Sequence, residues 1–159
     1  MHRLLTGISL AVATSAAANA QEVRVEFRPV MDEVQAYQHE IEGTVPSHGW
    51  QMMTAEDGGT YWVAPDVLIT NADIERAEVE MDAVRSRPVI EVFFATDGGK
   101  KFSDYTRDNV GSRVAIIFDG VIVSVPRIHD MIVGGSVQIS NISTIAEAER
   151  IARGIVAKE

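Results

Sequence analysis

The sequence predicts an α+β fold, in which a mixed or antiparallel sheet with two main helices joins a small N-terminal β-rich lobe. Residues 89–95 are β-branched or aromatic at nearly every position, which is typical of a central strand. Asp119-Gly120 separates two apolar runs and favours the two-residue turn of a β-hairpin. Residues 144–155 combine a T-x-x-E capping box with an apolar helical face. The resulting order of strand, strand, helix, hairpin, strand and helix indicates α+β.

The first twenty residues have the features of a secretory signal peptide. Arg3 supplies a positive charge, residues 4–18 are apolar or small, and Ala18-Asn19-Ala20 has the small-x-small form of a cleavage site. We predict cleavage after Ala20 and a periplasmic or secreted mature protein without stable membrane insertion. The alternative is a weak uncleaved anchor, which the short, Ala-, Ser- and Thr-rich run disfavours.

The chain is acidic and contains no cysteine. Its 14 Lys and Arg against 23 Asp and Glu give a formal net charge of −9. This charge repels phosphate backbones, so nucleic acid is not an expected partner. Because disulfides are excluded, a hydrophobic core must hold the fold together, and roughly 140 residues are enough for one domain.

Residues 21–65 are expected to form the β-rich lobe. Apolar and charged residues alternate over 23–27 and predict a strand that ends at Pro29. A weak helix is expected over 32–42. Two runs around an Asp-Gly-Gly turn predict a hairpin over 50–64, after which we place the lobe boundary.

Residues 66–159 are expected to form the second unit. Asn71 is expected to cap a short helix over 72–76, followed by a strand over 77–81. Thr96 or Asp97 is expected to cap the next helix, which carries one stripe of buried side chains. The remaining expected elements are strands at 89–95, 114–118, 121–125 and 137–139, and a final helix with Ile145, Ala148, Ile151, Ala152 and Ile155 on its buried face.

Several blocks between residues 88 and 152 resemble one known family in order and spacing. The blocks are Pro88-Val89-Ile90-Glu91-Val92, Gly99-Lys100-Lys101-Phe102, Thr106-Arg107-Asp108-Asn109-Val110-Gly111-Ser112-Arg113, Ala115-Ile116-Ile117-Phe118-Asp119-Gly120, Ser124-Val125-Pro126, Ile132-Val133-Gly134-Gly135-Ser136 and Gln138-Ile139-Ser140. Together they resemble the head subdomain of the first periplasmic domain of SecD, a membrane subunit that assists protein export. Residues 68–77 are similar to the family's lead-in, and Val25-Glu26-Phe27-Arg28 is a looser match to its first strand. The resemblance implies the family's fold and contact with exported polypeptide or translocon components.

Two features of the family's export subunits are missing from the sequence, namely several membrane-spanning helices and a glycine-rich Asp-Leu-x-Gly-Gly segment. A chain without membrane segments cannot convert a proton gradient into movement. We therefore expect this chain to share the binding role of the family and not its proton-driven pumping role.

Met and aromatic side chains gather on the expected hairpin, as Trp50, Met52, Met53, Tyr61 and Trp62. Such side chains adapt to varied apolar partners, although they also serve as core. A peptide-binding surface is expected only if Trp50 or Trp62 is exposed. The candidate partner-binding residues are Trp50, Met52, Trp62, Arg127, Gly134 and Gly135.

We predict that the chain is not an enzyme and uses no cofactor or metal. Its histidines outside the signal, His39, His48 and His129, lack metal-ligand spacing. His129 and Asp130 are the one candidate acid–base pair, but neighbours on an extended segment point to opposite faces. Gly134-Gly135 lacks the lysine of a phosphate loop. Acidic side chains along one expected helix are interpreted as solvated or dipole-complementing, namely Asp97, Asp104 and Asp108.

The leading hypothesis is a soluble periplasmic binding module that engages exported polypeptide or Sec translocon components. The alternatives are a repurposed small-ligand binder or hydrolase that uses His129 and Asp130, and an envelope interaction scaffold unrelated to export. A closed apolar pocket with converging polar groups favours the small ligand, whereas a grooved sheet surface with an exposed Met and aromatic patch favours protein binding.

Overall fold

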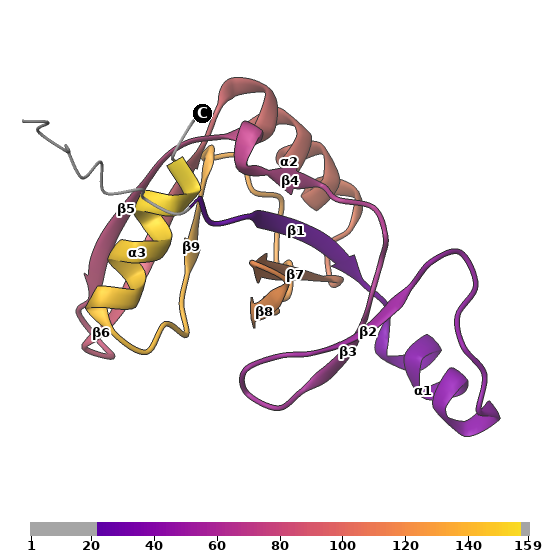
Figure 1. Ribbon diagram of the computed structural model, residues 1–159. Helices are drawn as coiled ribbons and strands as arrows, with labels where there is room; N and C mark the ends of the chain where they lie inside the picture. The colour runs from indigo at the N-terminus through magenta and orange to yellow at the C-terminus, as the bar shows by residue number, and fades with distance from the viewer. Residues whose placement is uncertain (1–21, 157–159) are drawn as a thin grey trace, which may run out of the picture.

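The computed structural model describes residues 22–156. They form two antiparallel sheets with three α-helices (Figure 1), which confirms the predicted α+β class. The expected signal peptide and its cleavage site lie outside the described residues. Every helix within residues 22–156 is too short or too polar to span a bilayer.

The larger sheet has β1 (Val25–Val30) near its middle. Its strand order is β2-β3-β1-β7-β8, and β4 pairs with β1 beside this path. The other strands are β2 (Gln51–Thr54), β3 (Thr60–Val63), β4 (Ile69–Thr70), β7 (Arg113–Phe118) and β8 (Val121–Ser124). β1 pairs along its whole length with β7, so strands from both sides of residue 65 share this sheet. Division of the chain at that residue stays a prediction.

The smaller sheet has the order β5-β6-β9, from Ile74–Asp82, Arg87–Phe94 and Ser136–Ile139. The central position of β6 agrees with its apolar sequence. α3 (Ile145–Val156) packs on β5 and β6, while α2 (Thr96–Asp108) lies beside the 3-10 turn η1 (Asn71–Asp73). α1 (Glu33–Glu42) lies at the opposite end of the molecule from α3 (Figure 1).

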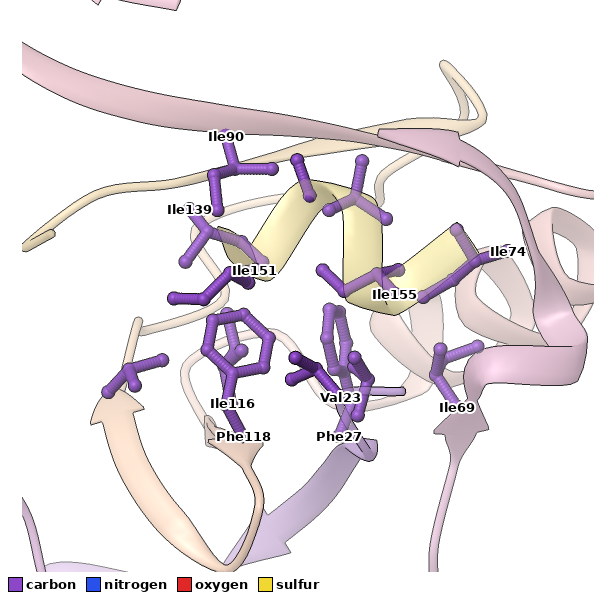
Figure 2. Close-up of a cluster of buried hydrophobic side chains, with 14 of the residues drawn as sticks. Val23, Phe27, Ile69, Ile74, Ile90, Ile116, Phe118, Ile139, Ile151 and Ile155 are labelled. Carbon is purple, nitrogen blue, oxygen red and sulfur yellow. The ribbon is translucent and has the colours of Figure 1, made fainter. Parts of the chain in front are cut away.

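The main core lies between α3, the smaller sheet and one face of β1 and β7. Figure 2 shows Ile151 and Ile155 of α3 close to Val23 and Phe27. The rings of Phe27, Phe94 and Phe102 pack with centroids 5.2–6.0 Å apart. A second, smaller core on the other face of the large sheet contains Val30, Ala55, Val63, Ala115, Ile117 and Ile122. β7 is apolar at consecutive positions because it is buried on both faces.

The start of the described chain is held against its last helix. The Val23 N–H donates to the Gly154 carbonyl oxygen at 3.2 Å. A Cβ at Gly154 would lie 2.3 Å from Val23 Cγ2, so this approach requires glycine. The Asn71 side chain accepts from the Val25 N–H at 2.9 Å and donates to the carbonyls of Val23 and Ile155 at 2.8 and 3.1 Å. One amide thus joins β1, η1 and α3.

α2 is held close to η1 in a similar way. A Cβ at Gly98 would lie 2.3 Å from the Asp73 carbonyl oxygen. Lys101 Nζ lies 2.7 Å from Asp73 Oδ1, and the Thr70 N–H donates to Asp73 Oδ2 at 2.9 Å. Partial burial raises the pKa of Asp73, but the hydrogen bonds from Lys101 and Thr70 outweigh it and hold the pKa below its ordinary value.

Two predicted strand and helix boundaries in the first half are wrong. Pro29 does not end β1, which continues to Val30. Pro29 is tolerated because the N–H of its β7 partner Val114 is directed to Pro126 and the β1–β7 ladder needs no donor there. The helix predicted over 72–76 is only the turn η1, because the Asn71 side chain bonds β1 and α3 and cannot serve as its cap.

Two predictions about the later helices also need correction. Ala95, and neither Thr96 nor Asp97, occupies the N-cap of α2, where its N–H donates to the Asp73 carbonyl. Ile145 is exposed although the predicted buried face of α3 includes it. The first turn of this helix is otherwise as expected, with Thr144 Oγ1 accepting from the Glu147 N–H at 3.1 Å.

Replacing Gly98 tests the contact between α2 and η1. We expect Gly98→Ala to lower the free energy of unfolding by about 1–3 kcal/mol, because its Cβ meets backbone that cannot move alone. Gly99→Ala is the matched control, since its Cβ meets ordinary contacts at 3.7 Å and helix propensity improves. Urea unfolding of both variants measures the difference, and equal stability would contradict the close approach.

Replacing Asn71 tests the junction at the start of β1. Asn71→Ala removes three hydrogen bonds to backbone groups, and we expect a loss of about 2–4 kcal/mol. Asn109→Ala is the control, because its side chain donates only to the Tyr105 carbonyl of its own helix. Thermal and urea unfolding should show that Asn71→Ala is much less stable than Asn109→Ala. The reverse order of stability would refute the junction.

The lowered pKa of Asp73 predicts a pH dependence of stability. Ionised Asp73 stabilises the fold above the unfolded-state pKa of about 4, and this contribution is lost as the pH falls through the lower folded-state value. Asp73→Asn should therefore be less stable than the parent at pH 7, with a smaller difference at pH 2.5. Urea unfolding at both pH values tests this, with the exposed Asp66→Asn as control. An equal difference in unfolding free energy between Asp73→Asn and the parent at both pH values would contradict this pH dependence.

Candidate functional site

α1 is a helix whose sequence specifies its ends but not a buried face. The Asp32 carboxylate accepts from the Val34 N–H at 2.9 Å, and Gly43 ends the helix with a φ of 62°. No side chain of this helix is buried. Val34, Tyr37 and Ile41 recur at helical spacing and are all exposed. The stripe that predicted the helix is thus turned to the surface.

The β2–β3 hairpin faces this helix across a recess. Asp57 accepts from the Gly59 N–H at 2.9 Å and closes the turn. The register pairs Met52 with Trp62 and Met53 with Tyr61. Met53 and Tyr61 pack against the smaller core, whereas Met52 is 61% exposed. One face of the hairpin therefore remains available.

We call this recess the α1 groove. Its volume is about 680 Å³, and it is open to the surface. The apolar part of its lining comes from α1, the segment after it and the hairpin. The residues that line it are Val30, Met31, Glu33, Ala36, Tyr37, His39, Glu40, Gly43, Thr44, Val45, Met52, Thr60, Tyr61, Trp62 and Arg113.

A charged cluster holds the start of α1 to the sheet. Glu33 pairs with Arg113 at 2.5 Å and with Arg127 at 3.0 Å. Arg127 also donates to the Gly111 carbonyl at 2.6 Å. Because α1 has no buried side chains, these contacts are central to its attachment.

A second recess, the loop pocket, lies beside Arg127. Its volume is about 390 Å³. Its lining is Phe27, Phe102, Val114, Ile116, Pro126, Arg127, Ile128, His129, Asp130, Met131, Ile132, Ser136, Val137 and Gln138. The segment between β8 and β9 forms a loop along this pocket. The buried Thr106 hydroxyl anchors the loop, because it accepts a hydrogen bond from the Ile132 N–H at 3.0 Å and donates one to the Ser103 carbonyl. At the loop's far end, the Gly135 carbonyl accepts from the Phe94 N–H at 2.8 Å.

The six candidate residues do not form one cluster. Met52 and Trp62 line the α1 groove, and Arg127 lines the loop pocket. Gly134 and Gly135 lie on the loop that borders this pocket. Trp50 is half-buried and lines neither recess. Whether any of these residues binds a partner stays a prediction.

Sequence reasoning missed residues that complete both recesses. Tyr37 and Val45 line the α1 groove, and Glu33 joins it to Arg127. The helical spacing of Val34, Tyr37 and Ile41 was a usable signal, but it predicted only a helix. The anchoring role of Thr106 could not be recognised from the sequence, because its hydrogen-bond partner Ile132 is distant in sequence.

The carboxylates and histidines show no arrangement for catalysis within the described chain. Asp130 accepts from the Met131 N–H at 2.7 Å, and no hydrogen bond among residues 22–156 joins it to His129. Hydrogen bonds from Lys100 hold the pKa of Asp104 below its ordinary value, and those from Arg107 do the same for Asp108. No three His, Asp or Glu of this part of the chain are grouped to hold a metal ion. Absence of enzymatic activity stays a prediction.

Comparison with known proteins identifies the family. A family model described as "SecDF, P1 head subdomain" matches residues 49–157. Protein translocase subunit SecDF of Thermus thermophilus is 39% identical over 85 residues, or 54% of this chain and 11% of that protein. SecD of Acidaminococcus fermentans is 36% identical over 87 residues, or 55% of this chain and 21% of that protein. The chain therefore spans a small part of the length of these relatives.

A solved structure described as that of "a membrane component SecDF that enhances protein export" shares the fold. It matches with a TM-score of 0.66 at 28% identity, over 96% of this chain and 71% of that one. The family match includes the β2–β3 hairpin and all later elements. Because the matched residues make up most of the chain and the fold is shared, this chain belongs to the SecDF P1 head subdomain family.

Proposed function

We propose that this chain is a non-catalytic periplasmic binding module that contacts exported polypeptide or Sec translocon components. The relatives are protein translocase subunits, and this supports protein export as the process in which the module acts. The observation that carries the proposal is the α1 groove, where apolar side chains remain uncovered. Tyr37, Val45 and Met52 are 62%, 73% and 61% exposed.

The form of the α1 groove suits polypeptide better than a compact ligand. It is an open recess between a helix and a hairpin, and the flexible Met52 side chain adapts to varied apolar groups. Trp50 and Trp62 are both half-buried, so the exposed tryptophan expected of a peptide-binding surface is absent from the described chain, and the exposed apolar groups of the groove are Tyr37, Val45 and Met52. Exposed aromatic and Met side chains of this kind mark protein-binding surfaces.

A second candidate function rests on the loop pocket. Its volume of about 390 Å³ and its largely apolar lining suit a small molecule, with Ser136 and His129 as polar groups. A thermal-shift screen with apolar metabolites tests this candidate. A raised melting temperature that is lost in Ile132→Glu would support it, whereas silence throughout would exclude it.

Site-specific photo-crosslinking tests the binding of unfolded polypeptide. A photoreactive residue at Val45 reports on the α1 groove, and one at Gly134 reports on the loop, where a Cβ meets nothing within 4 Å. We expect crosslinks to a reduced, carbamidomethylated polypeptide but not to its native folded form, because only the unfolded form exposes apolar segments.

The matched control carries the photoreactive residue at Val84, which is 90% exposed in the β5–β6 turn. Crosslinking of the unfolded polypeptide at Val84 as strong as at Val45 and Gly134 would mean non-specific adhesion. No crosslinking at any position would refute the proposed function.

A further inference from the structure

The smaller sheet has two edge strands that differ in charge. β5 lies at one edge and β9 at the other, with β6 between them. Five of the nine residues of β5 are Asp, Glu or Arg, and charged side chains on an edge strand oppose the addition of a further strand. β9 has the sequence Ser-Val-Gln-Ile and carries no charge. The edge of β9 therefore lacks the protection that the edge of β5 has.

The pairing of β9 with β6 determines which of its backbone groups point outward. The Phe94 N–H donates to the Gly135 carbonyl at 2.8 Å, so these two residues form a hydrogen-bonding pair. The next pair, Phe93 with Ser136, is then a non-hydrogen-bonded one. Because the two kinds of pair alternate, the N–H and C=O groups of Ser136 and Gln138 point away from β6. No other described residue hydrogen-bonds to these groups, and within the described chain only β6 pairs with β9.

The outward edge of β9 borders the loop pocket. Ser136, Val137 and Gln138 line this pocket, and so do residues 126–132 of the loop. Phe27 and Phe102 of the main core line it as well. The pocket thus brings hydrogen-bonding groups of a strand next to a largely apolar recess.

The length of this edge is limited at both ends. At the start of β9, the Gly135 carbonyl is used by Phe94. After β9, the Asn141 side chain donates to the Val123 carbonyl at 3.4 Å, so the chain there lies against β8. The four residues of β9 between these contacts span about 13 Å, which matches an added segment of about four residues.

We infer that an extended polypeptide segment adds as a strand to the edge of β9 and places a large apolar side chain in the loop pocket. The site is separate from the α1 groove, but its role rests on the proposed function. The added strand pairs with the backbone groups of Ser136 and Gln138. Every second side chain lies on the face of Val137, which packs against the main core, and the others lie on the polar face of Ser136 and Gln138. The segment recognised is therefore uncharged and alternates apolar with polar residues.

Other occupants fit this edge less well. A compact small molecule can use the apolar lining, but it leaves the backbone groups of Ser136 and Gln138 to water. A second copy offers from its smaller sheet only the charged edge of β5 or another β9 beside its own loop. Nucleic acid is repelled by the net charge of −9. An unfolded chain is the occupant that brings an uncharged strand and an apolar side chain together.

A pair of labelled peptides tests the role of the loop pocket. The parent peptide has blocked ends and carries Val, Leu and Val in alternation with Thr, and the second peptide has Ser in place of Leu. Fluorescence anisotropy with the whole chain measures their binding. We expect the Ser peptide to bind at least about tenfold more weakly, because the pocket loses its apolar occupant. Equal affinity of the two peptides would overturn the pocket as the site of this side chain.

Methylation of peptide amides tests strand addition without a change in any side chain. One peptide carries N-methyl groups on its Thr residues, and the other carries them on its apolar residues. Alternate amides of a strand point to opposite edges, so only one of the two sets faces β9. We expect one methylated peptide to bind about tenfold more weakly than the parent peptide and the other within about threefold of it. Similar affinity of both methylated peptides would show that no strand is added.

Gln138→Pro tests the same contact from the side of the protein. Proline at this position removes only the N–H that points away from β6, so the β6–β9 ladder keeps its bonds. The parent peptide should bind about tenfold more weakly to this variant, whereas Gln138→Thr, which keeps the N–H, should bind within about twofold of the unchanged protein. Urea unfolding checks that both variants fold, and the methylated peptides decide if the proline variant does not.

A double variant of the other recess separates this inference from the proposed function. Val45→Ser with Met52→Ser removes apolar side chains from the α1 groove and leaves β9 unchanged, so the parent peptide should bind it within about twofold of the unchanged protein. If this variant loses binding while Gln138→Pro binds normally, the inference fails and the proposed function stands. If no peptide binds but a metabolite stabilises the chain through the loop pocket, the pocket takes a small molecule and the inference is wrong. If no peptide binds and unfolded polypeptide crosslinks at neither Val45 nor Gly134, both fail.

Discussion

The attachment of β1 at both ends is the constraint on which the rest of the structure depends. At its start, Val23 occupies the space that a side chain on Gly154 would need, and Asn71 bonds the backbones of β1 and α3. Along its length, β1 pairs with β7, β3 and β4. β1 therefore divides the two cores and carries the chain from the α3 end to the α1 end of the molecule (Figure 1).

The two ends of β1 are built differently, and this difference suits a binding module. The α3 end is closed by isoleucines and phenylalanines in the main core (Figure 2). The α1 end has a helix without buried side chains, held mainly through Glu33. Weakly packed segments open at lower free-energy cost than cores do, and such segments commonly carry binding sites. Arg127 connects the α1 groove to the loop pocket, so a ligand in one recess lies close to groups that line the other.

Local turn chemistry was predictable from the sequence, whereas long-range placement was not. Asp119-Gly120 forms the expected hairpin turn because both residues adopt positive φ, at 48° and 83°. Asn71 was misassigned as a cap because its partners, Val23 and Ile155, are far away in sequence. The candidate site was predicted in part. Met52 and Trp62 belong to one recess and Arg127 to another, and sequence spacing alone cannot separate surfaces that face different ways.

The central claim is that the surface formed by α1 and the β2–β3 hairpin receives an unfolded polypeptide. Amide hydrogen exchange of the whole chain, with and without saturating carbamidomethylated polypeptide, tests this most directly. The account predicts slower exchange in α1 and the β2–β3 hairpin when the polypeptide is bound, because it covers the α1 groove, and unchanged exchange along β5. Unchanged exchange in α1 and the β2–β3 hairpin under saturation would contradict the account.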